Sequence, residues 1–369
     1  MQLRYKKITV KVGSNVLAKS DGTLNVSRIA HLVDQIALLH KNGVEVVLVS
    51  SGAVAAGRAV MQPSKKMDTV SQRQLWAALG QVKLISRYSD FFQEDGLVCA
   101  QVLTTKENFS SRGHYLNMKN CITTLLENKV IPIVNENDTI SVTELMFTDN
   151  DELSGLIASM VDSEALLILS NVDGVYSGHP ANKDAQLIEQ IEINQREPEN
   201  AISTEQSNFG RGGMHTKFRI AKKVAGDGIA VHVANGTKEN ILTDLLDVNK
   251  KVPHTYFVPN AKTSSGVKKW IAYSDGFVKG EIVVNEGAAK ALTSEKAVSL
   301  LPVGIVRIER EFKRGDLIRI LDETGESIGL GKAAYSSDKI EKEKQTEKQK
   351  PLVHYDYMYL ENKAKNNKI

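Results

Sequence analysis

The chain has 369 residues, of which 41% are hydrophobic and 25% charged, a composition ordinary for a soluble globular protein. Its length allows two domains, or one large domain and a small one. With 47 Lys and Arg against 44 Asp and Glu, the net charge of +3 is too small to indicate a nucleic-acid or membrane partner.

The two cysteines, Cys99 and Cys121, lie in apolar surroundings without the spacing of a metal site. They exclude a disulfide scaffold and indicate a reducing compartment. No segment approaches the ~18 apolar residues of a membrane span, and the first residues lack the apolar run of a signal peptide. We therefore expect a cytoplasmic protein with no membrane partner.

The first 250 residues, where we expect the catalytic domain, alternate between two hydrophobic patterns. Apolar runs typical of strands occur at 8–12, 44–49, 97–103, 130–134, 165–169 and 229–233. Apolar residues at helical spacing predict helices at 27–40, 70–94, 115–128, 153–160, 218–224 and 239–245. The alternation predicts an α/β fold, an open and mostly parallel sheet sandwiched by helices. Right-handed crossovers then bring the loops after the strands to one rim of the sheet.

Beyond residue 250 the composition changes. Residues 251–275 are polar and basic and contain prolines, which predicts a linker. Short strands broken by glycines are expected at 280–284, 304–308, 316–320, 328–333 and 351–355. Their spacing predicts a small β-barrel over residues 276–358, followed by a disordered tail over 359–369.

Polar residues lie in or after several of these strands and would meet at the same rim. They are Lys11 in the first strand, Ser51 after the second, the loop 135–139 (Asn-Glu-Asn-Asp-Thr) and the stretch 149–152 (Asp-Asn-Asp-Glu). Carboxylates suit an ammonium group, and amides suit a carboxylate, so these clusters predict a site for a small zwitterion. Each also has a plainer explanation: an edge-strand lysine facing water, small residues at a close helix contact, or ordinary N-caps.

The stretch 210–217, Gly-Arg-Gly-Gly-Met-His-Thr-Lys, precedes a predicted helix. Its glycines let the backbone approach a ligand closely, and the helix turns its positive dipole end toward the loop. Together with Lys217, this suits a polyphosphate. The spacing matches neither a P-loop nor a GxGxxG turn, because Thr216 precedes the lysine and His215 takes the third glycine position. An ordinary glycine loop that caps a helix is the alternative.

Taken in order, these motifs resemble the amino acid kinase family. The resemblance rests on residues 11–14, 50–53, 135–138, 149–151 and 212–217. It includes a C-terminal barrel similar to a PUA domain, with landmarks at 281–292 and 312–316. The chain departs from the family at Ser170–Asn171, where many members have Thr-Asp, and at Arg211, where many have Thr.

The resemblance implies transfer of the γ-phosphoryl group of ATP to the side-chain carboxylate of L-glutamate, the first step of proline biosynthesis. This carboxylate is ionised at neutral pH and needs no general base, so positioning and electrostatics carry catalysis. By resemblance, Lys11 and Lys217 neutralise charge on the transferring group, and Asp151 orients both lysines. Mg²⁺ would bridge the β and γ phosphates, held mostly by phosphate and water.

The remaining expected site residues also come from the resemblance. Ser51, Asp138 and Asn150 match the glutamate-binding positions. The ATP-binding positions are Lys11, Ser170, Asn171, Arg211, Gly212, Gly213, Met214, His215, Thr216 and Lys217. The family further implies feedback inhibition by proline and a homo-oligomer, either a tetramer or a dimer.

Two other functions compete with this one. In the first, the chain is another member of the family, whose acceptor is acetylglutamate, aspartate or a nucleotide. Such members do not usually carry a PUA-like barrel. In a different class, the barrel binds RNA through its basic residues Lys268, Lys269, Lys279, Arg307, Arg310, Lys313 and Arg314. Many carboxylates accompany these residues, and no basic stripe interleaved with aromatic residues is present.

Overall fold

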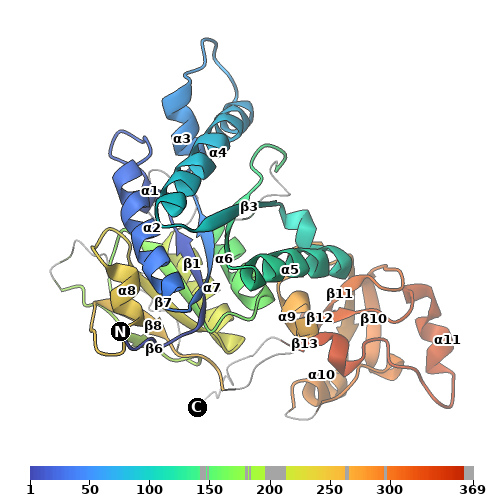
Figure 1. Ribbon diagram of the computed structural model, residues 1–369. Helices are drawn as coiled ribbons and strands as arrows, with labels where there is room; N and C mark the ends of the chain where they lie inside the picture. Colours follow the sequence, from blue (N-terminus) through green and yellow to red (C-terminus); the bar gives the residue numbers. More distant parts are fainter. Residues whose placement is uncertain are drawn as a thin grey trace. The chain divides into compact units, whose positions relative to one another are not determined.

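The computed structural model describes residues 1–141, 147, 149–178, 182, 184–195, 213–261, 266–294 and 297–360. It divides into two units, Met1–Thr263 and Ser264–Ile369, each with its own sheet (Figure 1). Within the described part of the chain, no helix is long and apolar enough to cross a membrane.

The first unit is built on an eight-stranded sheet. Its strands, in spatial order, are β3 (Val98–Thr104), β4 (Val130–Glu136), β2 (Glu45–Ser50), β1 (Lys7–Val12), β5 (Ala165–Ser170), β7 (Ala230–Asn235), β8 (His254–Phe257) and β6 (Gln190–Ile191). Neighbouring strands run parallel, except that β7 and β8 are antiparallel. The predicted mostly parallel α/β sheet is confirmed.

Helices cover both faces of this sheet. They are α1 (Ser14–Leu17), α2 (Val26–Lys41), α3 (Ala53–Val60), α4 (Thr69–Glu94), η1 (Lys106–Phe109), α5 (Arg112–Glu127), α6 (Asn150–Met160), α7 (Met214–Gly226) and α8 (Ile241–Leu246). Ile8, Val10 and Val12 of β1 join α2, α4 and α8 in one hydrophobic core. Because alternate residues of a strand face opposite sides, Thr9 and Lys11 face α6 instead.

Several element boundaries differ from the prediction in ways that affect the site. β4 continues through Asn135 and Glu136, which we expected in a loop, because both residues pair with the end of β3. α6 begins at Asn150 and α7 at Met214, each earlier than predicted. Polar residues assigned to loops by their chemistry are therefore held by regular backbone hydrogen bonds.

The segment 251–275, predicted to be a linker, contains β8. This strand pairs with β7 and β6 and belongs to the sheet of the first unit. Prolines at 253 and 259 flank it and suggested irregular structure, although its residues alternate in burial as a half-buried strand does. β6 lies within the predicted excursion 179–209, of which residues 179–181, 183 and 196–209 lie outside the described residues.

The second unit holds a five-stranded sheet around its own core, which confirms the predicted small β domain. In spatial order the strands are β10 (Ile305–Arg310), β9 (Gly280–Val284), β11 (Leu317–Leu321), β12 (Ser327–Lys332) and β13 (Met358–Leu360). Its helices are α9 (Gly266–Ala272), η3 (Asp275–Phe277), α10 (Glu286–Leu292), η4 (Pro302–Gly304), η5 (Ser337–Lys339), α11 (Ile340–Lys344) and η6 (Tyr355–Tyr357).

Both ends of this unit differ from the prediction. α9 packs against β12 and β13, so the unit begins before residue 276. The last strand is β13 and not 351–355, where Val353 forms only an isolated bridge to Leu300. The first two residues of the predicted tail, Tyr359 and Leu360, therefore belong to the sheet, and residues 361–369 lie outside the described part.

Candidate active site

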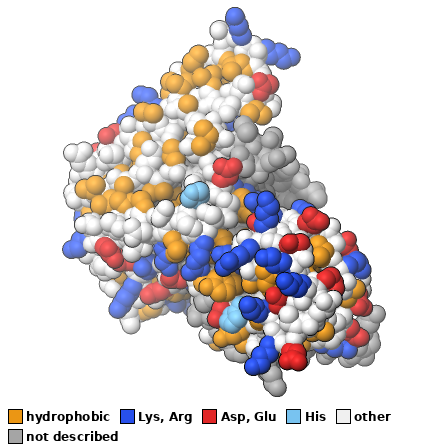
Figure 2. Space-filling view, turned by 90° about the vertical axis from the view of Figure 1, so that its right-hand side faces the viewer, with side chains coloured by type: hydrophobic (Ala, Val, Ile, Leu, Met, Phe, Trp, Pro, Cys, Tyr) orange, Lys and Arg blue, Asp and Glu red, His pale blue; other side chains and the backbone are white. Residues whose placement is uncertain are grey.

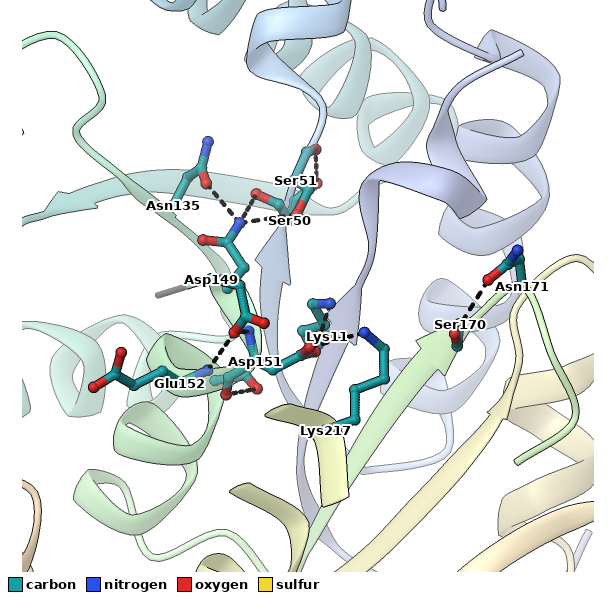
Figure 3. A network of polar contacts seen from close by, with 12 residues as sticks. Lys11, Ser50, Ser51, Asn135, Asp149, Asp151, Glu152, Ser170, Asn171 and Lys217 are labelled. Carbon is teal, nitrogen blue, oxygen red and sulfur yellow. Dashed lines mark hydrogen bonds and ion pairs between the residues drawn. The ribbon is translucent and has the colours of Figure 1, made fainter. Parts of the chain in front are cut away.

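Two lysines and one aspartate lie together beside the central strand of the first unit (Figure 3). Asp151 Oδ1 is 2.5 Å from Lys11 Nζ, and Asp151 Oδ2 accepts a hydrogen bond from Lys217 Nζ at 2.9 Å. The three residues come from β1 and from the first turns of α6 and α7. Asp151 is completely buried and both lysines nearly so. The structure thus brings together all three residues predicted to be catalytic.

Lys11 lies at the centre of the sheet, with Val49 and Ile168 beside it in register on β2 and β5. The alternative of an edge-strand lysine facing water is therefore wrong. A methyl group on Gly13 would lie 3.3 Å from both Lys11 Nζ and the Leu169 carbonyl oxygen. Glycine at this position leaves room for the ammonium group.

Burial opposes the charge on all three groups, and their mutual attraction offsets it. Burial disfavours the ionised carboxylate of Asp151, but the two lysines outweigh it and hold the pKa of Asp151 below its usual value. Burial lowers the pKa of Lys11, although Asp151 partly counteracts this. For Lys217, the attraction of Asp151 outweighs burial and raises the pKa. One carboxylate between two ammonium groups suits a site for an anion such as phosphate.

Asp149 caps the N-terminus of α6. Its Oδ1 accepts hydrogen bonds from the backbone N–H groups of Asp151 at 2.9 Å and Glu152 at 3.1 Å, so the N-cap explanation holds for this residue. Burial and the adjacent charge of Asp151 raise the pKa of Asp149 to about 7. Its other oxygen, Oδ2, is buried and has no hydrogen-bond partner among the described residues.

Asn150 connects the lysine cluster to the ends of β2 and β4. Its Nδ2 donates to Ser51 Oγ and Asn135 Oδ1, each at 3.0 Å, and to the Ser50 carbonyl oxygen at 3.3 Å. Asn135 Nδ2 donates in turn to Gln81 Oε1 of α4 at 3.0 Å. The structure thus joins Ser51 and Asn150, two of the residues predicted to bind the acceptor.

Asp138, the third such residue, lies just beyond β4 and is paired with α4. Arg73 Nη2 is 2.5 Å from Asp138 Oδ1, and Gln74 Nε2 donates to the Thr139 carbonyl oxygen at 2.8 Å. The sequence analysis missed these α4 residues. Gln74 and Gln81 are seven residues apart and so lie on one helix face, a spacing from which a polar face on α4 could have been predicted.

Glu136, at the end of β4, anchors the segment that leads to α6. Its Oε1 accepts a hydrogen bond from the Phe147 backbone N–H at 2.9 Å, and the Phe147 ring meets Phe109 edge-on at 5.6 Å between centroids. Burial raises the pKa of Glu136 to about 7, against the effect of the Phe147 hydrogen bond. Residues 142–146 and 148 lie outside the described residues.

Apart from Lys11 on β1, the described residues predicted to bind ATP lie at the end of β5 and at the start of α7. Ser170 ends β5, where its Oγ donates to Asn171 Oδ1 at 3.4 Å and its carbonyl oxygen accepts from the Gly236 N–H at 2.8 Å. Gly213 is the N-cap of α7 and supplies no side-chain cap. This helix N-terminus, with Lys217 in its first turn, offers a positive dipole end to a phosphate.

The rest of the predicted ATP-binding stretch divides between helix and undescribed chain. Met214, His215 and Thr216 lie on the first turn of α7 with Lys217. Arg211 and Gly212 lie outside the described residues. The placement of that turn follows from packing, because α7 contacts α6, the helix that carries Asp151.

Comparison with known proteins assigns both units. Residues 6–235 match the model of the amino acid kinase family, and residues 280–352 match that of the PUA domain. A protein named glutamate 5-kinase from Bacteroides thetaiotaomicron is 57% identical over 361 residues, which is 98% of this chain and 100% of the relative. One of the same name from Chlorobaculum tepidum is 46% identical, covering 96% of this chain and 98% of that protein.

A solved structure has the same fold in the first unit. The carbamate kinase from Giardia lamblia bound to AMP-PNP aligns with a TM-score of 0.50 over 70% of this chain and 99% of that chain. Because the two sequences are only 18% identical, the similarity concerns the fold alone.

Proposed function

This chain belongs to the amino acid kinase family, and we propose that it transfers the γ-phosphoryl group of ATP to the side-chain carboxylate of L-glutamate, giving glutamyl 5-phosphate and ADP. This is the first step of proline biosynthesis. One observation carries the proposal. The cluster of Lys11, Asp151 and Lys217 lies directly beside the polar network around Asn150, whose residues suit an amino acid.

Catalysis rests on charge and position. The attacking carboxylate is ionised at neutral pH, so no base is needed, and the barrier comes from bringing two anions together. Lys11 and Lys217 stabilise negative charge on the transferring phosphoryl group. Asp151 holds each ammonium group through a separate oxygen and so orients both lysines. Burial strengthens these interactions, because water screens them little.

Substrates occupy the two sides of this cluster. Ser51, Asp138 and Asn150 bind L-glutamate. ATP binds at the C-terminal end of β5 and the N-terminal end of α7, through Ser170, Asn171 and the stretch 211–217. Support comes from the register of the parallel strands, which brings their carboxyl ends to one rim, as in other open α/β sheets.

Mg²⁺ enters with the nucleotide. Among the described residues, no group of three or more His, Cys, Asp and Glu side chains is arranged to hold a metal ion, and Asp151 is committed to two lysines. Phosphate oxygens and water would therefore provide most of its ligands. A Mg²⁺ ion held in this way would supply positive charge to offset that of the phosphates.

Proline inhibition, a homo-oligomer (tetramer or dimer) and a cytoplasmic location are further proposals that family membership supports. So is a division of labour in which the first unit carries catalysis and the PUA unit affects assembly or regulation. Titration of the activity with proline and measurement of the mass in solution test the first two.

RNA binding by the PUA unit is the competing function. Of the basic residues that suggested it, Arg307 is paired with Glu309, and Arg310 with Glu281, which also pairs with Arg319. On the face that Figure 2 shows, Lys and Arg side chains have Asp and Glu side chains among them. A salt-dependent mobility shift with RNA would revive this function.

An acceptor panel tests the proposed function. ADP release, coupled to an indicator reaction, is followed with L-glutamate, N-acetylglutamate, L-aspartate and a nucleoside monophosphate as acceptors. We expect kcat/KM to be highest for L-glutamate by orders of magnitude. A preference for any other acceptor would overturn the proposal.

A further inference from the structure

We propose that Arg73 is a specificity-determining residue of the acceptor site. Its guanidinium binds the α-carboxylate of the acceptor, while its partner Asp138 binds the α-ammonium group. The inference rests on the proposed function, since it assigns the recognition of an amino acid at that same site. It extends the acceptor site to α4, an element that none of the motifs includes.

Arg73 and Asp138 form a pair through single atoms. Arg73 Nη2 lies 2.5 Å from Asp138 Oδ1, so one nitrogen of the guanidinium is engaged. Arg73 Nε is buried and has no hydrogen-bond partner among the described residues. A buried donor without an acceptor is rare in a folded protein and indicates a missing partner. The Arg73 side chain is 32% exposed, so the guanidinium also reaches solvent, from which a ligand can enter.

Arg73 lies on α4, a helix that is held firmly against α3. α3 packs closely on α4, because Gly57 lies against the Trp76 carbonyl and Gly80 against the Ala53 carbonyl, where any larger residue would overlap. The Trp76 indole N–H donates to the Met61 carbonyl oxygen at 3.0 Å and ties the two helices again. Arg73 is thus presented by a fixed scaffold, as a binding residue requires.

The same helix also positions the rest of the acceptor site. Gln81 accepts from Asn135 in β4, and Gln74 donates to the carbonyl oxygen of Thr139 beyond it, so α4 contacts the chain on both sides of Asp138. Arg73 is the cation among these α4 contacts. A cation and an anion fixed side by side match the two charges of an α-amino acid, each meeting its opposite.

Asn150 and Asp151 relate the acceptor site to the two lysines. Asn150 links Ser51 and Asn135 on one side, and its chain neighbour Asp151 binds the two lysines on the other. An acceptor with its α-carbon groups at Arg73 and Asp138 can therefore extend its side-chain carboxylate past Asn150 toward the lysines. The charged pair thus recognises the α-carboxylate and α-ammonium groups, at the end of the substrate that does not react.

The test uses two analogues, each of which lacks one charge of L-glutamate. 4-Aminobutyrate lacks the α-carboxylate, and glutarate lacks the α-ammonium group. The variants are Arg73→Met, Arg73→Lys and Asp138→Asn. The control is Arg87→Met, which replaces an exposed arginine of the same helix that pairs with the exposed Asp90 at 3.9 Å. kcat and KM are measured by ADP release at saturating MgATP. Where turnover of an analogue is undetectable, its inhibition constant against L-glutamate replaces kcat/KM.

For Arg73→Met we expect kcat/KM with L-glutamate to fall on the order of 10- to 100-fold, mainly through KM, as for loss of a charged hydrogen bond. With 4-aminobutyrate the change stays within about threefold, because that analogue has nothing for Arg73 to bind. Arg73→Lys recovers part of the loss, and Arg87→Met behaves as wild type. Asp138→Asn lowers kcat/KM for L-glutamate and 4-aminobutyrate but leaves the value for glutarate nearly unchanged.

Equal losses for all three acceptors in Arg73→Met would assign Arg73 a purely structural role and overturn the inference, as would no loss for any. If Arg73→Met does not fold, Arg73→Lys decides: an unchanged ratio of L-glutamate to 4-aminobutyrate would refute the assignment. Failure of the proposed function is distinguishable, because it appears in the wild type as a preference for an acceptor other than L-glutamate.

Discussion

Asp151 uses one carboxylate oxygen for each lysine, so the two ammonium groups share one buried anchor. Removing either lysine leaves that carboxylate with a single partner and removes positive charge from a site where water screens little. Substitutions here should therefore act on the transition state more than on binding of the acceptor, which we propose Asn150, Ser51 and Asp138 perform.

Replacing Lys217 with Ala is expected to lower kcat by about 10²- to 10³-fold, the range for removing one preorganised charge-stabilising donor. The KM for L-glutamate should change much less, because the proposed role of Lys217 is to stabilise the transferring phosphoryl group. Steady-state kinetics measure both. Lys222→Ala, further along α7, serves as the control, since Lys222 donates to the Gln195 carbonyl oxygen and not to Asp151. A kcat within a factor of a few of wild type would refute the transition-state role.

Asp138→Ala is expected to act in the opposite way. Its main effect should be a raised KM for L-glutamate, because the variant removes the anion proposed to bind the α-ammonium group. Arg73 also loses its partner, so the charge of the pair becomes positive. The comparison is kcat and KM with wild type under the same conditions. An unchanged KM together with a collapsed kcat would contradict the binding assignment.

Glu136 makes stability depend on pH. Burial raises the pKa of its carboxyl group from 4.5 to about 7 in the folded protein. Below pH 4.5 the group is protonated in both the folded and unfolded states, so its contribution is fully present. As the pH rises toward 7, only the unfolded state ionises readily, and stability is lost.

Glu136→Gln keeps an oxygen that accepts from the Phe147 N–H but removes the ionisation. Between pH 5 and pH 8 the free energy of unfolding of the variant should gain about 2 kcal/mol relative to wild type. Urea unfolding at both pH values measures the gain. Glu127→Gln, an exposed glutamate on α5, is the control. The same offset between variant and wild type at both pH values would contradict the assigned shift.

At the scale of elements, the contact between α3 and α4 decides the geometry of the acceptor site. Gly57 and Gly80 let the helices approach closely, so the alternative explanation of the small residues after β2, close helix packing, holds for Gly57. The same closeness brings Arg73, Gln74 and Gln81 to the end of β4 and the residues that follow it. Packing and recognition are therefore coupled through α4.

Gly80→Ala is expected to force the two helices apart and lower the free energy of unfolding by about 1–3 kcal/mol, the usual cost of overpacking. The KM for L-glutamate should rise, and that for ATP should change little, because α4 holds only the acceptor side. Gly113→Ala in α5 is the matched control, since among the described residues nothing outside its own stretch of helix lies within 4 Å of the added methyl group. Equal effects of the two variants would contradict this account.

At the scale of the whole molecule, the chain forms two units with separate hydrophobic cores. Lys11, Asp151 and Lys217, the proposed catalytic residues, meet in the first unit because parallel strands end at one rim. The second unit includes α9, which lies in the segment predicted as a linker and contacts β12 and β13. Packing therefore places its boundary before residue 276, where the strand pattern predicted that it begins.

A fragment that begins at Ser264 is expected to fold alone, since it contains a complete core. A fragment that begins at Phe277 lacks α9 and should melt lower by about 5 °C or more. Thermal unfolding followed by circular dichroism compares the two. Identical melting temperatures would show that α9 adds nothing to the stability of this unit.

Much of the fold and of the catalytic cluster was predictable from the sequence. Local hydrophobic periodicity predicts strands and helices. Lys11, Asp151 and Lys217 belong to short motifs whose order indicated the family, and the comparisons confirm that family. The small second domain was predictable for the same reason, from the spacing of its strands. The glutamate and ATP roles of individual residues stay predictions.

Other features are decided only by the tertiary structure, because they depend on contacts between distant segments. Arg73 meets Asp138 across 65 positions of sequence, and no local pattern marks either as the partner of the other. β8 is a strand because β7 and β6 lie beside it, although prolines flank it in the chain. The sequence by itself determined the elements and the kind of chemistry at the rim. Packing of α4 on α3 decided which cation lies beside Asp138, because only folding brings that helix to the end of β4.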